Sequence, residues 1–463
     1  MKSRFFRWIR WFNAAERVPQ RGRRRLMLEQ LESRIAPAVR TWTGLGANDL
    51  WSNAANWDTG VPVDSDDVRI AATAESAEVL FDTSVAGTGV TINSLTRDGA
   101  NPVSEPLRIT GDTLTLSGAG IFALGAGLTI AGGTVSAANA VSADTFTFSS
   151  GTLTGAGTVT ISGATTWTGG TMSGAGTTTT NGSLAINADN APGLDTRTLN
   201  VNGGATLTGS ANSVGGKNGA VINNASLFDI QSDADFRNLL DGATPTFNNL
   251  ATGTFRKSGG AGITDVSFAF NNLGTVQVLS GTLALGDAVQ RSGSTLTGGT
   301  WQVFANSTLT IAGNTVLSTS NATILLDGVN SVFLNVANLA TNNGTFTIQN
   351  GRNFNPSAFF DNAGQVFISD GCTFTLNHGS ITENTGRWAI TSAGVLEFTG
   401  FGQTATTDNL NAGSNVSGAG TVRFSAGGAG GNTTNLAGTY SASRTEIAGG
   451  TANFNANAST TTL

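Results

Sequence analysis

The feature that most limits how this chain can fold is a short strand-like pattern that returns about every 20–25 residues. In each copy apolar residues alternate with threonine or another polar residue, as at 344–348, 364–368 and 386–390. A second strand-like stretch begins about eight residues later, as at 372–376 and 394–398. A period of two is typical of strands with one buried face. Two phased strands in a repeat of this length predict one coil of a β-solenoid.

We therefore expect an all-β protein whose residues 106–454 form a right-handed parallel β-helix, the handedness following the general preference of parallel crossovers. Apolar side chains would stack inside successive coils, with glycine and asparagine at the corners, where a positive φ is often needed. The 62 glycines disfavour a helical bundle, because glycine is a poor helix former. Hydrophobic residues make up 39% of the chain, which is enough for a sizeable core, and charged residues only 12%.

Residues 1–38 differ in composition from everything that follows. They carry a net charge of +7, whereas the remainder carries −13. Cations and aromatic rings alternate at 5–12, which suits contact with an anionic membrane surface or with export machinery. We expect this segment to be a helical or disordered targeting segment. It lacks the apolar run of about 7–15 residues found in secretory signals, and no window reaches the ~18 apolar residues of a transmembrane span.

Within this segment a run of arginines is followed by a short motif and then by Ala36-Pro37-Ala38. The motif residues are Leu28, Glu29, Leu31, Glu32 and Arg34. The motif resembles the LEPR-XLL type of N-terminal motif that opens many large exported proteins of planctomycete bacteria. The resemblance implies a targeting role and an extracellular or cell-surface location in a bacterial envelope, reached by a non-conventional signal. The alternative is a short amphipathic helix with a Glu/Arg face.

Residues 39–105 begin with three tryptophans close together, Trp42, Trp51 and Trp57. We interpret this segment as the entry of the solenoid, where buried rings would cover an open end that otherwise exposes core and strand edges. An exposed cluster that stacks on sugars is the alternative. The segment resembles the opening of autotransporter-like bacterial surface β-solenoids, and residues 438–454 resemble repeats of filamentous-haemagglutinin-like adhesins. Residues 455–463 form a polar tail.

Two groups of carboxylates are candidate sites. Asp64, Asp66 and Asp67 are weak candidates for Ca²⁺, since carboxylate oxygens are its usual ligands, but their spacing is not that of an EF-hand and a solvated acidic turn is the alternative. The densest ionisable cluster lies at 229–237, which we expect to be a solvated loop between coils. Residues 215–219 are rich in glycine but lack the spacing of a phosphate-binding loop.

The chain has one cysteine and one histidine, so neither a disulfide within the chain nor a His/Cys metal centre is expected. Cys372 fits a small residue of a strand, and His378 a surface loop. We expect no catalytic residues, no resident metal and no cofactor.

These observations predict a non-catalytic, structural or adhesin-like β-solenoid of the bacterial cell surface. Its partners would be surface glycans or other envelope proteins, held by weak multivalent contacts through threonine and asparagine side chains. Nucleic acid is not an expected partner, because the body of the chain is acidic. One alternative is a polysaccharide lyase or hydrolase on a β-helix scaffold. Another is a passive segment of a larger surface protein.

Overall fold

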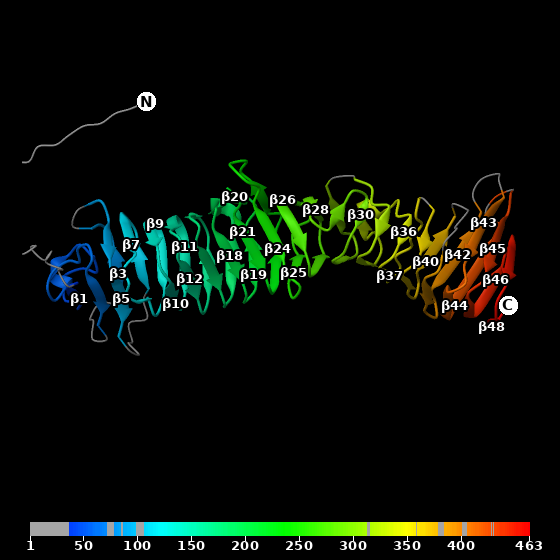
Figure 1. Cartoon of the computed structure of the whole chain (residues 1–463), viewed down its shortest axis with the longest axis horizontal. Coiled ribbons are helices and arrows are strands. Elements are labelled where there is room, and N and C mark those ends of the chain that lie inside the picture. The colour runs from blue at the N-terminus through cyan, green and yellow to red at the C-terminus, as the bar shows by residue number, and fades with distance from the viewer. Residues whose placement is uncertain are drawn as a thin grey trace, which may run out of the picture. The chain divides into compact units, whose positions relative to one another are not determined.

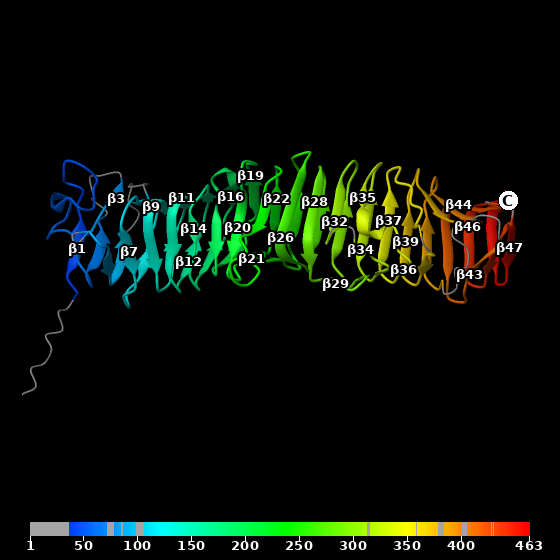
Figure 2. The ribbon, with the colours of Figure 1, turned by 90° about the horizontal axis from the view of Figure 1, so that it is seen from above.

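The chain divides into two compact units, Met1–Pro37 and Ala38–Leu463. The computed structural model describes residues 37–71, 78–84, 87–98, 106–312, 315–357, 359–377, 384–400, 405–426, 428 and 430–463. Everything below concerns the second unit. It is a parallel β-solenoid, as the repeats predict, and its strands follow one another along a single axis from β1 to β48 (Figures 1 and 2).

Each full coil contributes a strand to three ladders, in which a strand pairs in parallel with its counterparts in the coils before and after. The first ladder begins with β1 (Val39–Trp42), β2 (Asp67–Ile70), β5 (Ser94–Arg97), β8 (Phe122–Ala123), β10 (Val141–Ala143), β12 (Thr158–Ile161), β15 (Thr177–Thr180), β18 (Thr198–Val201), β21 (Val221–Asn224), β24 (Thr246–Asn249) and the end of β26 (Ile263–Asn272).

Beyond β26 the first ladder is carried by two smaller sheets. One contains β29 (Arg291–Ser292), β30 (Thr295–Leu296), β33 (Thr319–Ser320), β36 (Thr341–Asn342) and β38 (Asp361–Asn362), and the other β43 (Thr406–Leu410), β45 (Asn432–Leu436) and β47 (Thr451–Phe454). The pair β29–β30 is antiparallel, a local hairpin in an otherwise parallel arrangement.

The second ladder contains β3 (Val79–Phe81), β6 (Leu107–Ile109), the first halves of β9 (Leu128–Ala137) and β11 (Phe146–Thr154), β13 (Thr165–Trp167), β16 (Leu184–Asn187), β19 (Ala205–Thr208), β22 (Leu227–Ile230), β25 (Thr254–Lys257), β27 (Thr275–Val278), β31 (Thr300–Val303), β34 (Thr323–Asp327), β37 (Thr345–Gln349), β39 (Gln365–Ile368), β41 (Arg387–Ile390), the first halves of β44 (Asn415–Ser425) and β46 (Thr439–Ile447), and β48 (Ala458–Thr462).

The third ladder contains β4 (Val90–Ile92), β7 (Thr113–Leu116), the second halves of β9 and β11, β14 (Thr171–Met172), β17 (Gly193–Asp195), β20 (Ser213–Lys217), β23 (Asp235–Asn238), the start of β26, β28 (Thr282–Ala288), β32 (Thr308–Ile311), β35 (Val332–Phe333), β40 (Thr373–Leu376), β42 (Val395–Thr399) and the second halves of β44 and β46. Three short 3-10 helices complete the described elements: η1 (Ala54–Asn56), η2 (Ala188–Asn190) and η3 (Leu334–Val336).

The prediction of two strands per coil was incomplete, because the two strands it phased belong to the second and third ladders and the repeat left out the first. Several strands of the first ladder point polar side chains inward, such as Thr178 and Thr180 in β15 and Asn249 at the end of β24. Alternation between apolar and polar residues is weak along those strands, whereas β12 keeps it through Val159 and Ile161. Elsewhere aliphatic and aromatic residues fill one continuous core.

Both ends of the unit are built from paired strands. Residues 39–105, interpreted as an entry segment, already supply β1, β2 and β5 to the first ladder. The polar tail at 455–463 supplies β48, whose exposed residues pair in parallel with β46.

Candidate binding surface

Two columns of hydroxyl groups run along the outer side of the third ladder. In each of these strands the alternate residues point into the core, as Leu114, Val135, Leu153 and Met172 do. The residues between them face outward and stand in register from one coil to the next. One column is Thr113, Thr134, Thr152 and Thr171, and the other is Thr91, Thr115, Ser136 and Thr154. We call these eight residues the hydroxyl track.

The track is regular in two directions. Along the axis its hydroxyls repeat at the spacing of neighbouring strands, about 4.8 Å, and across a strand the columns lie two residues, roughly 6.6 Å, apart. All eight side chains are half-buried between their neighbours. In the part of the chain that the structure describes, none of the eight hydroxyl groups makes a hydrogen bond to the protein. Their donors and acceptors are therefore available to solvent or to a ligand.

The track ends where the outward residues change character. Gly193 stands opposite Thr171 in the next coil, and the columns beyond carry charges. There the Lys217 Nζ lies 3.6 Å from a carboxylate oxygen of Asp195 and 3.1 Å from one of Asp241. The track itself contains no ionisable side chain, and the charged groups beside it are the carboxylates of Asp64 and Asp112, which accept from the N–H groups of Thr91 and Thr113.

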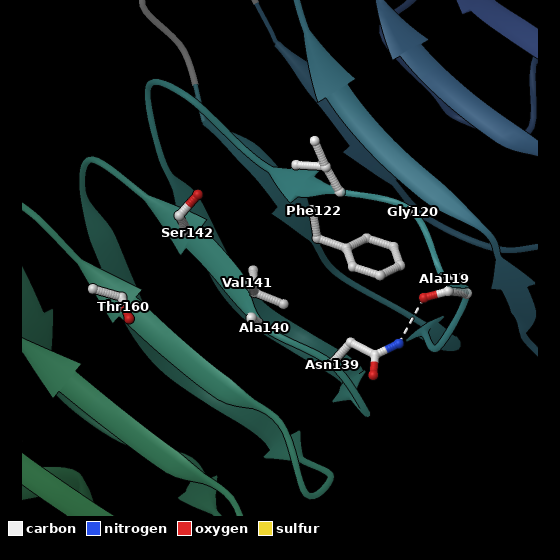
Figure 3. Close-up of a pocket in the computed structure, with 10 residues that line it drawn as sticks. Ala119, Gly120, Phe122, Asn139, Ala140, Val141, Ser142 and Thr160 are labelled. Atoms are coloured by element: carbon white, nitrogen blue, oxygen red, sulfur yellow. Dashed lines mark hydrogen bonds between the residues drawn. The ribbon is translucent and has the colours of Figure 1, made fainter.

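A shallow groove of about 460 Å³ opens at the corner that follows the track (Figure 3). It is lined by uncharged residues of the loops and strands at 118–122, 139–142 and 160. Asn139 reaches across it and donates from Nδ2 to the carbonyl of Gly118 at 2.6 Å. Ile121 stands 69% exposed at its edge, whereas Ser142 and Thr160 lie side by side on β10 and β12.

Glycine explains why the groove lies on this side of the loop. A Cβ added to Gly118 would collide with the Cα of Asn93, and one added to Gly120 with Ser94, both in the preceding coil. The Ala119 N–H also donates to Asn93 Oδ1 at 3.2 Å. The loop at 118–120 therefore packs closely against the preceding coil. The space left between this loop and the following coil is the groove.

Asparagine ladders occupy the first ladder, both inside and outside. Inside, Asn224 donates to Asn249 Oδ1 and Asn249 to Asn272 Oδ1, each at 2.9 Å, and all three side chains are fully buried. The sequence predicts asparagine at the corners of the coils, whereas these Asn-Asn pairs lie at the ends of first-ladder strands. The informative signal was their recurrence at the coil period, which places amides in register.

The outer ladder runs beside the inner one and consists of Asn200, Asn223, Asn248 and Asn271, linked amide to amide at 2.8–3.2 Å. These amides satisfy one another, unlike the hydroxyls of the track.

The three N-terminal tryptophans are brought together in the interior. The ring of Trp57 packs edge-on against Trp42 and Trp51, with centroid distances of 5.0 and 4.7 Å. Its Nε1 donates to the carbonyl of Trp51 at 2.8 Å. Trp42 and Trp51 have no exposed surface, and Trp57 is 5% exposed. Rings buried in this way offer no face to a sugar.

Asp64, Asp66 and Asp67 lie close in sequence but point to different partners. Asp64 accepts from the N–H of Thr91, and Asp66 pairs with Arg40 at 2.9 Å. Asp67 accepts from the side chains of Asn93 and Ser94. Among the residues that the structure describes, no group of three or more His, Cys, Asp or Glu side chains is placed to hold a metal ion.

The prediction that 229–237 is a solvated loop is wrong. These residues form β22, a short turn and β23, which pair with the next coil. Asp229 is buried and accepts two hydrogen bonds of 2.9 Å from Arg256, and Asp233 pairs at 2.7 Å with the fully buried Lys257. The alternation of buried and outward residues around Phe228 and Phe236 is typical of strands. The aspartates between these two residues hide that pattern in the sequence.

One pair of carboxylates does lie on the outer side of the third ladder. The Asp265 N–H donates to Asp235 Oδ1 at 2.7 Å, so the two residues occupy neighbouring coils. Burial and the charge of Asp235 raise the pKa of the Asp265 carboxyl, whereas the charge of Arg237 and a hydrogen bond with Ser267 oppose this rise. Two carboxyl groups on neighbouring coils, one of them with a raised pKa, are the kind of pair that acid–base chemistry uses.

The remaining sequence predictions concern buried residues, a turn, and residues outside the described ranges. Cys372 is fully buried directly before β40, and residues 215–219 belong to β20 and the turn after it. His378 lies outside the described residues, as do the motif residues Leu28, Glu29, Leu31, Glu32 and Arg34.

Comparison with known proteins returned no match: no family model, curated protein or solved structure is significantly similar to this chain. Within the described ranges there is no helix with the length and apolar character needed to cross a bilayer. The surface geometry is therefore the basis for any functional argument.

Proposed function

We propose that this chain is a structural, adhesin-like β-solenoid of the bacterial cell surface, without catalytic activity, that makes weak multivalent contacts with glycans or other envelope components. The observation that carries this proposal is the hydroxyl track. It offers free donors and acceptors repeated from coil to coil, and linked weak contacts of this kind add up to useful avidity.

Export to the envelope is supported by the N-terminal motif around Leu28–Arg34, which resembles the motif of exported planctomycete proteins. The test is fractionation of native cells with an antibody to residues 40–463, followed by protease treatment of intact cells. Loss of the full-length band from intact cells is the expected result. A protease-protected cytoplasmic band would overturn the surface location.

One specific observation favours a second candidate, a polysaccharide lyase or hydrolase. It is the carboxylate pair Asp235 and Asp265 on neighbouring coils, one with a raised pKa. Paired carboxylates cleave glycosidic bonds when one donates a proton and the other stays ionised. Turnover of a polysaccharide panel, abolished in both Asp235→Asn and Asp265→Asn but kept in Asp287→Asn, would establish this alternative. We expect no turnover.

A further inference from the structure

We propose that the hydroxyl track binds an extended, uncharged, β-linked polysaccharide chain that lies along the solenoid axis with one sugar residue per coil. This inference rests on the proposed function and specifies its ligand. The two columns stand on either side of a line above the buried Leu114, Val135 and Leu153. A chain lying on that line has hydroxyl groups along both flanks.

The coil spacing favours this orientation. Successive coils rise by about 4.8 Å, and an extended β-linked polysaccharide advances by a similar length per sugar. Each sugar then meets an equivalent pair of side chains, as in Thr113 with Thr115, Thr134 with Ser136 and Thr152 with Thr154. With Thr91 at one end and Thr171 at the other, the track spans five coils. It therefore accommodates about five sugars in register, the middle three on pairs of hydroxyls and the outer two on a single hydroxyl each.

The chemistry of the track favours an uncharged ligand. A hydroxyl both donates and accepts hydrogen bonds, as sugar hydroxyls do. The track has no cation that could pair with the carboxylates of an acidic polysaccharide. Farther along the third ladder, Lys217 is already paired with Asp195. The outer asparagine ladder differs from the track, because its amides are already paired with one another. The track combines two parallel columns of hydroxyl groups whose hydrogen-bonding capacity is left for a partner.

The adjoining groove adds an apolar contact at the edge of the same surface. Thr115 and Ser136 lead directly into the loops that form its walls, and Ile121 is largely exposed there. A sugar presents CH groups as well as hydroxyls, so an uncharged chain or its neighbour on a polysaccharide surface can pack against Ile121. A flat charged ligand would gain nothing from this contact.

The experiment uses the full chain and neutral β-1,4-linked glucose and mannose oligosaccharides from monosaccharide to octasaccharide, with affinity electrophoresis in gels containing the matching polysaccharide to detect weak binding. We expect affinity to rise with length to about the pentasaccharide and then level off. Since each hydroxyl contributes a modest net hydrogen bond, the double variant Thr134→Val with Thr152→Val should weaken binding about tenfold. Valine keeps the shape and the β-branch of threonine, so the fold is preserved.

The matched control is Thr147→Val with Thr166→Val, which removes two exposed, adjacent hydroxyls from the second ladder instead. It should bind within about twofold of the unmodified chain. Equal binding by the two double variants, binding that does not depend on chain length, or a preference for an acidic polysaccharide such as polygalacturonate would overturn the inference. Failure of the unmodified chain to bind any neutral or acidic polysaccharide would overturn the glycan-binding part of the proposed function as well.

Discussion

Arg197 is a charged side chain held inside the solenoid, and its only described hydrogen-bond partners are uncharged. Its guanidinium donates to Thr178 Oγ1 at 2.8 Å and to the carbonyls of Gly155, Gly157, Ser173 and Thr177 at 3.1–3.3 Å. These acceptors belong to two preceding coils, so one side chain ties three coils together. Burial lowers the pKa of Arg197 to about 10, which leaves it charged at neutral pH.

Replacing Arg197 with alanine should destabilise the protein by about 3–5 kcal/mol, because five buried acceptors lose their donor together. The measurement is the free energy of unfolding in urea, read by circular dichroism. Arg197→Lys should recover little of the loss, since an ammonium has three donors and lacks the planar fork. Arg237→Ala, which removes an exposed arginine, is the control. Equal stability of Arg197→Ala and Arg237→Ala would contradict this account.

The ion pair between the buried Lys257 and the half-buried Asp233 predicts a loss of stability in acid. Burial opposes ionisation of Asp233, but the hydrogen bonds from Lys257 and from the Gly262 N–H prevail and lower its pKa below the ordinary 3.8. A lowered pKa means that the ionised carboxylate favours the folded state. Its contribution is complete well above pH 3.8 and is lost as the pH falls through the lowered value.

Unfolding free energies of the natural chain and of Lys257→Met, measured from pH 6 down to pH 2, test this prediction. The variant should be less stable at pH 6 but should lose less stability on acidification, because Asp233 no longer has the partner that lowers its pKa. Parallel curves for the two proteins would show that the pair does not contribute to the acid response.

At the scale of single elements, the inner asparagine ladder gives polar strands a place in the core. Asn249 accepts from Asn224, donates to Asn272 and donates to the carbonyl of Thr275. Removing its amide takes the donor from Asn272 Oδ1 and from the Thr275 carbonyl, and takes one of three acceptors from the Asn224 amide. Asn249→Ala should therefore cost roughly 2–3 kcal/mol of unfolding free energy.

The neighbouring Asn248 provides a close comparison, because it lies in the same strand and makes the same kind of amide contact on the outer side. Water can replace its partners there, so Asn248→Ala should cost less than about 1 kcal/mol. Chemical unfolding of both variants gives the difference directly. A larger loss in Asn248→Ala would mean that the outer ladder, and not the inner one, holds these coils in register.

The element scale also shows what the sequence could and could not predict. Strands of the second and third ladders alternate aliphatic or aromatic residues with threonine, and that pattern identified them and the solenoid. Much of the first ladder escaped because its inward positions hold polar residues such as Thr178 and Asn249, whose buried hydrogen bonds no hydropathy pattern detects. The track escaped for another reason: Thr113, Thr134, Thr152 and Thr171 are unequally spaced, and only the pairing of strands places them in one column.

At the scale of the whole unit, each coil contacts mainly the coils before and after it. Stability in such a stack is approximately a sum of local terms, so damage at one end should not spread to the other. The N-terminal end is closed by Trp42, Trp51 and Trp57, and Trp51 also packs against Phe81 of the second ladder at a centroid distance of 5.3 Å. A substitution in this tryptophan cluster is therefore well placed to show whether stability is lost only in the first coils or along the whole unit.

Trp51→Ala should open the N-terminal coils and leave the distant ones unchanged. The substitution removes a fully buried ring and leaves a cavity, a loss of about 3–5 kcal/mol. Because the lost contacts involve only the first coils, amide hydrogen exchange measured by mass spectrometry should accelerate in peptides covering β1 to β4 and remain unaltered in those covering β37 to β42. Trp388→Ala, which removes an equally buried ring from β41, should give the opposite distribution. If either variant accelerated exchange evenly along the chain, the coils would form one cooperative unit, and an exchange experiment could not assign stability to individual coils.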